Sequence, residues 1–304
     1  MKFAAKKVAP SKLGGRPPAA VEISTEGVLA AASPGAGQAS VYAFAPLAPG
    51  TVSPAIEGTN LRDPGAVAKA IRTALGDVSP RTHFVTLILP DTLVRVFMLD
   101  FDSMPAKPAE AISVVRFRLR KMVPFDVEHA GVSHQVLSQN EAECKVLAAV
   151  VPGPVLAEYE TAVRDAGYEP GAVLSSSLAA LEAVDDMEAV MAANLSTLAI
   201  TTSIANGQDL LLYRTLDLPQ DPKQRLYEVQ RSIAVAAAYY EDKLGSRPRR
   251  LHYAGSVPGP DFARALDDPE LSVVDWVPRP ESGAVTTLPQ TSYAGVAGAL
   301  TGAR

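Results

Sequence analysis

The sequence predicts an α/β protein of two lobes, and three observations lead to this prediction. Strand-like and helix-like segments alternate twice, first over residues 20–184 and again over 196–300. The run HFVTLILP at 83–90 is apolar almost throughout, which is typical of a strand covered on both faces of an α/β sheet. The length of 304 residues is enough for about two domains of roughly 100–200 residues each.

The first alternation is expected to open with a β-hairpin. VEISTEGVLAAA, within 20–32, predicts two short strands around a turn at Thr25-Glu26-Gly27. Asp63 followed by Pro64 has the pattern of a helix N-cap and first helical position. The further elements expected in this half are strands at 40–47, 83–90, 93–101, 129–137 and 144–151, helices at 108–122 and 152–167, and a short strand and helix within 171–184.

The second alternation is expected to start with another hairpin, at 196–216. Its turn, Asn206-Gly207, is the strongest short hairpin signal in the chain. A long alanine-rich helix at 223–244 is expected to end at Gly245, because glycine adopts the left-handed conformation that closes helices. The remaining elements expected are a strand at 249–254, a helix at 260–266, a strand at 271–277 and a small-residue helix at 293–300.

Composition excludes several classes of protein. The net charge is −5, from 28 basic and 33 acidic residues, which argues against coating nucleic acid. The single cysteine, Cys144, excludes a disulfide framework and a cysteine-rich zinc site, and it favours a reducing, cytoplasmic compartment. No run of about 20 apolar residues is present that would predict a membrane span.

Residues 1–19 are interpreted as a flexible basic leader. They contain five basic residues and no acid, and they lack the apolar core of a signal peptide. The alternative interpretation is a weak electrostatic tether to anionic lipid. The basic residues are Lys2, Lys6, Lys7, Lys12 and Arg16.

The sequence lacks the motifs of a catalytic site. No P-loop, dinucleotide-binding GxGxxG, GxSxG elbow or HExxH metal motif occurs. His129 and His134 are five apart on an expected strand, so they should point to opposite faces and bind no common metal. Cys144 follows an acidic turn that should raise the pKa of its thiol. Asp100 and Asp102 are interpreted as the end of a strand rather than as a cation site. We therefore expect no catalytic residue and no metal.

The central stretch of the chain resembles the PilM family of actin-like proteins of type IV pilus assembly. The resemblance is carried by Leu89-Pro90, Asp102–Pro105, Val123-Pro124-Phe125 and His134–Leu137, within HFVTLILPDTLVRVFMLDFDSMP and AISVVRFRLRKMVPFDVEHAGVSHQVL. Looser matches extend over most of the chain and include both hairpins and the C-terminal helix.

The resemblance implies a two-lobed actin/Hsp70-like ATPase fold. The first lobe would span 20–195, with a small inserted ββαββ domain at 84–151. The second lobe would span 196–304 and include the closing C-terminal helix. This lobe would be truncated, because only DLPQDP separates the expected hairpin from the long helix, where the family carries a further subdomain over the adenine.

In active members of this fold, glycine-containing turns hold the nucleotide and nearby acids help to hold magnesium. The matching positions here have lost that pattern. The first turn should read D-x-G and has Glu22 and Ser24, and the second matches the region of Thr201 and Thr202. The third should read G-G and holds Gly255-Ser256. We therefore expect a pseudo-ATPase without nucleotide, in which ATP and magnesium are cofactors only if the degenerate site still binds them.

The resemblance also implies a partner, the cytoplasmic N-terminal peptide of a PilN-like bitopic inner-membrane protein. Part of the contact is expected at Arg116, Arg120 and Phe125 on the inserted domain. The protein would then be a cytoplasmic scaffold, peripheral to the inner membrane through this partner, beside other pilus assembly proteins and possibly in a homo-oligomer or ring. Two alternatives stay open: an active actin-like ATPase or sugar-kinase relative, and the cytoplasmic domain of a GspL-like type II secretion protein.

Overall fold

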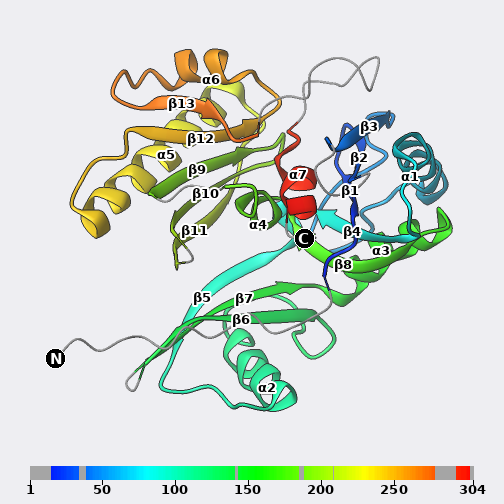
Figure 1. The fold of residues 1–304 in the computed structure, drawn as a ribbon, viewed down its shortest axis with the longest axis horizontal. Coiled ribbons are helices and arrows are strands. Elements are labelled where there is room, and N and C mark those ends of the chain that lie inside the picture. Colours follow the sequence, from blue (N-terminus) through cyan, green and yellow to red (C-terminus); the bar gives the residue numbers. More distant parts are fainter. Residues whose placement is uncertain are drawn as a thin grey trace.

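The fold consists of two lobes, each built on a five-stranded sheet, and a small third domain (Figure 1). A computed structural model describes residues 15–33, 39–140, 143–184, 188–207, 209–277 and 292–301. The basic residues of the leader before residue 15 lie outside these ranges. The leader is shorter than expected, because strand β1 already begins at Ala19 and Arg16 pairs with Glu182 at 3.1 Å.

The first sheet has the order β3-β2-β1-β4-β8. Its strands are β1 (Ala19–Ile23), β2 (Gly27–Ala32), β3 (Val41–Pro46), β4 (Phe84–Leu89) and β8 (Glu169–Ser175). Strands β1 to β3 form an antiparallel meander, whereas β4 and β8 run parallel to β1. The expected hairpin at 20–32 is confirmed as β1 and β2. Five of the six residues of β4 are buried, which confirms that this apolar run is a covered strand.

Helices cover both faces of the first sheet. The apolar sides of α1 (Pro64–Val78) and α3 (Gly153–Asp165) share one core with it. The N-cap prediction for α1 is confirmed, because the carboxylate of Asp63 accepts a hydrogen bond from the N–H of Ala66. The opposite face packs against α7 (Ala294–Thr301), which in turn contacts α4 (Ser176–Leu181).

The second sheet has the order β11-β10-β9-β12-β13. Its strands are β9 (Ala189–Leu195), β10 (Ala199–Asn206), β11 (Asp209–Asp217), β12 (Arg250–Gly255) and β13 (Ser272–Asp275). Helices α5 (Pro222–Leu244) and α6 (Gly259–Leu266) share its main core. Gly245 closes α5 in the left-handed conformation, as expected, and the Asn206-Gly207 hairpin joins β10 to β11. Because β9 pairs with both β10 and β12, this sheet begins at residue 189, inside the range expected for the first lobe.

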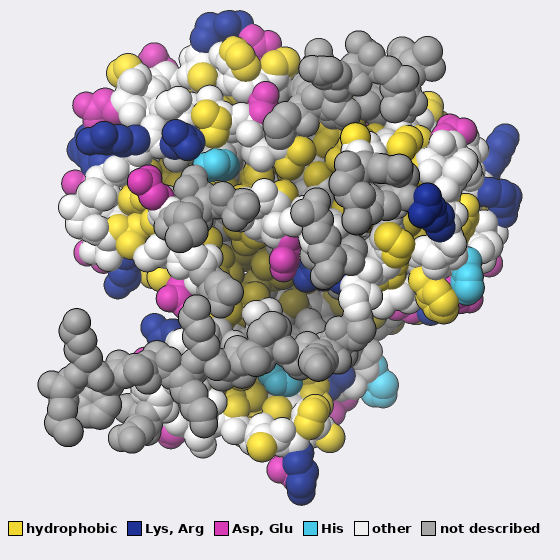
Figure 2. Space-filling view, viewed as in Figure 1, with side chains coloured by type: hydrophobic (Ala, Val, Ile, Leu, Met, Phe, Trp, Pro, Cys, Tyr) yellow, Lys and Arg dark blue, Asp and Glu magenta, His cyan; other side chains and the backbone are white. Residues whose placement is uncertain are grey.

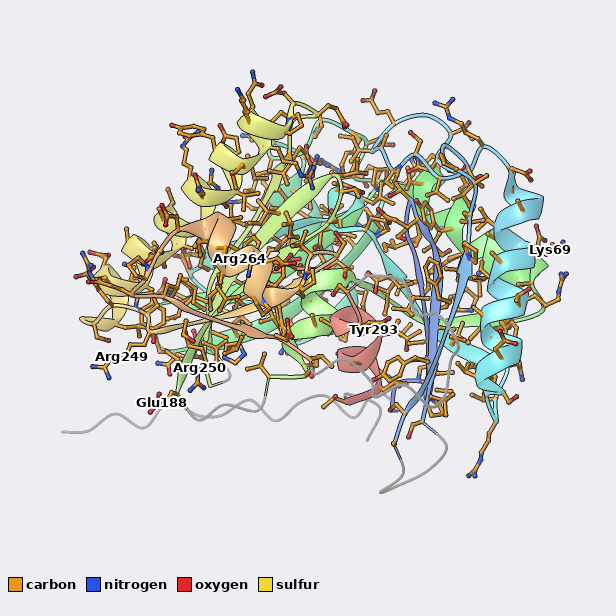
Figure 3. All side chains as sticks on the ribbon, turned by 90° about the horizontal axis from the view of Figure 1, so that it is seen from above. Lys69, Glu188, Arg249, Arg250, Arg264 and Tyr293 are labelled. Carbon is orange, nitrogen blue, oxygen red and sulfur yellow. The ribbon has the colours of Figure 1, made fainter. Side chains whose placement is uncertain are left out.

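Helices α4 and α7 lie between the two sheets (Figure 1). Ala180 of α4 and Ala294 of α7 belong to a buried cluster with Val190, Ala192 and Ala254 of the second sheet. Seen from above, Tyr293 lies near the middle of the molecule, between the first lobe carrying Lys69 and the second lobe carrying Arg249, Arg250 and Arg264 (Figure 3). The C-terminal helix therefore closes the structure against the first lobe rather than extending the second.

The small domain inserted in the first lobe has a three-stranded sheet of order β5-β7-β6. Its elements are β5 (Arg95–Phe101), α2 (Pro108–Leu119), β6 (Gly131–Gln139) and β7 (Cys144–Val151). The expected ββαββ grouping is corrected in one respect, because β4 pairs with β1 and β8 of the first sheet. A short helical turn, η1 (Asp91–Leu93), joins β4 to β5.

Candidate inter-lobe site

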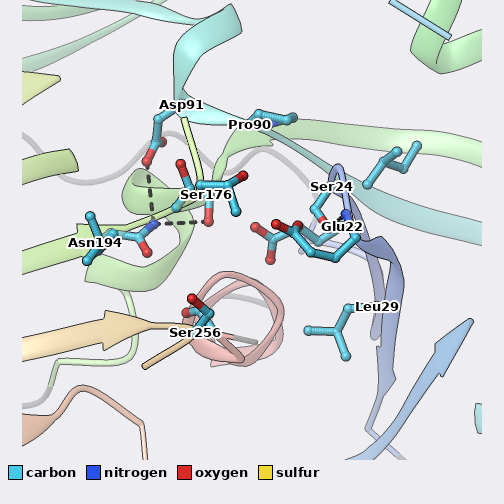
Figure 4. Close-up of a pocket in the computed structure, with 14 residues that line it drawn as sticks. Glu22, Ser24, Leu29, Pro90, Asp91, Ser176, Asn194 and Ser256 are labelled. Atoms are coloured by element: carbon cyan, nitrogen blue, oxygen red, sulfur yellow. Dashed lines mark hydrogen bonds between the residues drawn. The ribbon is translucent and has the colours of Figure 1, made fainter. Parts of the chain in front are cut away.

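The candidate site is a small cavity at the junction of the two lobes. Its volume is about 90 Å³, below the roughly 300–1,000 Å³ of typical small-molecule sites. Polar side chains from both lobes line it: Glu22, Ser24, Glu26, Asp91, Ser176, Asn194, Ser196, Thr197, Ser256 and Ser292. Figure 4 shows these groups converging from β1, η1, α4, β9 and the end of β12.

Two matching turns face each other across the cavity, one from each lobe. In the β1–β2 turn, the hydroxyl of Ser24 accepts hydrogen bonds from the N–H groups of Glu26 and Gly27, both at 3.3 Å. In the β9–β10 turn, the hydroxyl of Ser196 accepts them from Leu198 and Ala199, at 3.2 and 3.0 Å. Two backbone N–H groups of each turn are therefore already hydrogen-bonded within that turn, whereas a glycine-containing turn would present such groups to a phosphate.

Direct contacts also join the two turns and anchor the second one. The hydroxyl groups of Thr25 and Thr197 lie 3.0 Å apart across the lobe boundary. From α5, the guanidinium of Arg225 donates to the carbonyls of Ser196 and Thr197, at 2.6 and 2.5 Å. Carbonyls as well as N–H groups of the β9–β10 turn are therefore satisfied by the protein itself.

Glu22 is a buried carboxyl group on β1 at the wall of the cavity. Its pKa is raised from 4.5 to about 7, and burial is the main cause. A hydrogen bond with Ser176 opposes this rise, whereas the nearby carboxylates of Asp91 and Glu26 add to it. Its Oε2 has no hydrogen-bond partner among the described residues. A carboxyl group with this pKa is largely protonated below neutral pH, which makes it a weaker cation ligand than an ionised aspartate.

Asp91 is the centre of a hydrogen-bond network that crosses the lobe boundary. Its Oδ1 accepts from the N–H of Ser177 at 3.0 Å and from the hydroxyl of Tyr213 at 3.3 Å. Its Oδ2 accepts from the hydroxyl groups of Ser177 and Thr201, at 2.5 and 3.0 Å, and from the amide of Asn194 at 3.4 Å. Burial nevertheless raises the pKa of Asp91, because these bonds offset only part of the cost of desolvation. One carboxyl group of the first lobe thereby binds three strands of the second.

Glycines of α7 allow the C-terminal helix to close one side of the cavity. A Cβ at Gly295 would lie 2.6 Å from Oε2 of Glu22, and one at Gly298 would lie 1.9 Å from the carbonyl oxygen of Ala179. Both distances are too short for non-bonded atoms. The close approach of α7 to β1 and α4 thus depends on the absence of side chains at these two positions.

The structure brings some of the predicted turn residues together and separates others. Glu22, Ser24 and Ser256 line the cavity. Gly255 is the last residue of β12 and lies against the ring of Tyr253. The expected position of the second turn is wrong: Thr201 and Thr202 are buried within β10, and the turn between the lobes lies at Ser196–Leu198.

Seven of the ten polar residues of the site were not predicted from the sequence: Glu26, Asp91, Ser176, Asn194, Ser196, Thr197 and Ser292. A local signal exists for three of them, Asn194, Ser196 and Thr197. Glu22-Ile23-Ser24-Thr25 in the first turn corresponds to Asn194-Leu195-Ser196-Thr197 in the second, an acid or amide followed by an apolar residue and two hydroxyl residues. Asp91 has no such signal, because its partners come from residues 86 to 122 positions later in the chain.

The expected partner-binding residues lie together on the small domain. The guanidinium of Arg116 donates to the carbonyl oxygens of Val127 and Glu128, and Arg120 forms an ion pair with the carboxylate of Glu128. Phe125 is half-buried against the domain core. Both arginines therefore fasten the segment after α2 to the helix, and Phe125 lies in that segment.

The structure also shows where the residues lie that were expected to have no catalytic or metal-binding role. His129 lies just before β6 and pairs with Asp126, whereas His134 lies within the strand. Cys144 is buried, and this burial raises the pKa of its thiol. Asp100 lies at the exposed end of β5, with Asp102 just beyond it.

Over the described ranges, no three acids, histidines or cysteines are grouped as they would be around a metal ion. Nor is any helix there both long and apolar enough to span a membrane.

Solved structures share this architecture. Over 94% of this chain and 98% of its own length, PilM in the PilM–PilN type IV pilus biogenesis complex superposes with a TM-score of 0.74 at 19% identity. The cytoplasmic domain of EpsL, an inner-membrane component of the type II secretion system of Vibrio cholerae, covers 88% of this chain and 90% of its own, with a TM-score of 0.50 at 13% identity. The actin-like fold predicted from the resemblance is confirmed. No protein-family profile and no curated sequence matches the chain.

Proposed function

We propose that this protein is a scaffold of a type IV pilus machine that binds the cytoplasmic N-terminal peptide of a PilN-like inner-membrane protein. The observation that carries this proposal is the superposition on PilM, which extends over nearly all of both chains in a structure named for its complex with PilN. A location in the cytoplasm at the inner membrane follows from such a partner. EpsL favours type II secretion as the second candidate, with a lower TM-score.

The scaffold is proposed to work without nucleotide turnover. Both turns that face the cavity use serine hydroxyl groups to satisfy their own N–H groups, and the volume of about 90 Å³ is small for a nucleotide. In addition, only residues 218–221 join β11 to α5, which leaves no room for the subdomain that the family carries over the adenine at this place. An active ATPase of the pilus machine is the alternative, with ATP and magnesium as its cofactors.

Isothermal titration with Mg·ATP tests the absence of nucleotide binding. We expect no heat of binding at millimolar ATP, because a phosphate would have to displace the hydroxyl groups of Ser24 and Ser196 from their turns. Micromolar binding would show that these turns rearrange and would overturn the pseudo-ATPase part of the proposal.

Co-purification with the cytoplasmic N-terminal peptide of a PilN-like membrane protein tests the scaffold role. We propose that the contact includes the segment carrying Phe125, which Arg116 and Arg120 hold against α2. Arg116→Glu combined with Arg120→Glu should release this segment and reduce peptide capture by about tenfold or more. Normal capture by this variant would refute the placement.

A matched control comes from the same helix. Arg118→Glu combined with Lys121→Glu makes the same change in charge at exposed positions at the end of α2 and in the turn after it. We expect this variant to bind the peptide as the wild type does. Equal loss in both variants would mean that net charge, not the Phe125 segment, determines capture.

A further inference from the structure

The C-terminal end of α2 and the turn that follows it carry an apolar and basic surface on the small domain. Ala111, Val115 and Leu119 face the core of the domain, and the opposite side of the helix is exposed. Phe117 is 66% exposed and Met122 is 42% exposed. Arg118 and Lys121 are exposed beside them, without an ion-pair partner among the described residues. We call these four residues the α2 tip.

The α2 tip differs in charge from the rest of the molecule. Residues 107–129 contain five basic and three acidic residues, although the whole chain has a net charge of −5. The three acids are each engaged locally: Glu110 with Lys107, Glu128 with Arg120 and Asp126 with His129. Two cations, on Arg118 and Lys121, are therefore free to attract an anionic surface.

The position of α2 suits a flat surface better than a groove. The helix lies at the end of the small domain, away from both lobes (Figure 1), and apolar and basic side chains are seen together at this end of the molecule (Figure 2). A protruding aromatic side chain between long cationic side chains is the pattern of an interfacial anchor. The ring enters the headgroup region while the cations stay at the phosphates.

We propose that the α2 tip docks reversibly on an anionic lipid surface. Each basic residue near such a surface contributes about 1 kcal/mol, and burial of an aromatic ring adds to this. Two cations and one ring give weak binding, which suits an auxiliary contact. This proposal depends only on the residues of the α2 tip and does not require the peptide partner.

The test is vesicle sedimentation of the full chain, with phosphatidylcholine vesicles with and without about 30% phosphatidylserine. We expect binding only to the anionic vesicles, weakening between low and physiological salt as the Debye length shortens to about 8 Å. Phe117→Ser combined with Lys121→Glu should lower the partition coefficient about tenfold. No binding by the wild type, or unchanged binding by this variant, would overturn the proposal.

A matched control variant separates the α2 tip from general charge effects. Leu226→Ser combined with Lys223→Glu, on the exposed side of α5, also removes one exposed apolar residue and reverses one charge. It should bind as the wild type does. An equal loss would assign the binding to net charge and overturn the proposal.

A fluorescence readout tests insertion directly. The chain has one tryptophan, Trp276, which is buried at 6% exposure. In a Phe117→Trp variant the new indole should shift its emission to the blue on anionic vesicles and not on neutral ones. An unshifted spectrum would overturn the proposal, and capture of an acidic protein without vesicle binding would mean that the α2 tip is a protein-binding surface instead. Peptide capture by Phe117→Ser with Lys121→Glu should stay normal, so this proposal and the scaffold role fail separately.

Discussion

The hydroxyl of Thr25 lies 3.0 Å from the hydroxyl of Thr197, and these two residues come from the matching turns of the two lobes. In a nucleotide-driven protein of this fold, the space between such turns is where phosphates bind. Here the turns touch each other, and their N–H groups are bonded to Ser24 and Ser196. The lobes are joined by side chains at the point where a ligand would join them.

The Thr25–Thr197 contact predicts a crosslink that is independent of ligand. Thr25→Cys combined with Thr197→Cys should form a disulfide under mild oxidation, because the two hydroxyl groups are already close. Since the native Cys144 is buried, it should not compete. Non-reducing electrophoresis measures the rate, and we expect the same rate with and without Mg·ATP. A clear change with Mg·ATP would mean that nucleotide moves the lobes.

The buried carboxyl group of Glu22 predicts an unusual dependence of stability on pH. Its pKa is about 7 in the folded protein and near 4.5 when unfolded. Its protonation therefore favours the folded state fully below about pH 4.5, and this contribution is lost as the pH rises through 7. The shift corresponds to about 3 kcal/mol between these limits.

Glu22→Gln tests this dependence, because glutamine keeps the shape and stays neutral. Urea unfolding at pH 5 and pH 8 should show the variant gaining stability relative to the wild type at the higher pH. Other titrating groups are common to both proteins and cancel in the comparison. Parallel profiles would contradict the raised pKa.

The network around Asp91 predicts a strong dependence of folding on one carboxylate. Asp91→Ala would leave buried donors on Ser177, Thr201 and Tyr213 without their acceptor, at a cost of about 3 kcal/mol in the free energy of unfolding. Urea denaturation measures the change. The control is Asp100→Ala, an exposed acid at the end of β5, which should change stability by less than about 0.5 kcal/mol. Similar changes in the free energy of unfolding for both variants would mean that the Asp91 network does not stabilise the contact between the lobes.

Replacement of glycine by alanine is expected to have opposite effects at two helical positions, Gly298 in α7 and Gly76 in α1. Gly298→Ala should destabilise the protein by more than about 2 kcal/mol, because the new Cβ meets the carbonyl oxygen of Ala179. Gly76→Ala, in α1, has no atom within 4 Å and should stabilise by about 0.5–1 kcal/mol. Thermal unfolding distinguishes the two, and a stable Gly298→Ala variant would mean that α7 packs less closely than described.

Local chemistry made several elements predictable from the sequence alone. The N-cap at Asp63, the αL end at Gly245 and the Asn206-Gly207 hairpin each depend on residues within a few positions of one another. The apolar run of β4 and the serine that replaces glycine at Ser24 are also visible without a partner. The sequence thus determined the element types and the changed chemistry of the first turn.

Only the tertiary structure decided which elements meet. The sheet to which β4 belongs depends on pairing with β1 and β8, far away in the chain, and the second turn lies before β10 because β9 pairs with it. Asp91 became part of a site through donors up to 122 residues away. The spacing of apolar residues and the identity of capping residues act between positions close together in the sequence. Sheet order and buried hydrogen-bond networks depend instead on packing between residues far apart in the sequence. That is why the turn at Ser24 was found from the sequence and the Asp91 network was not.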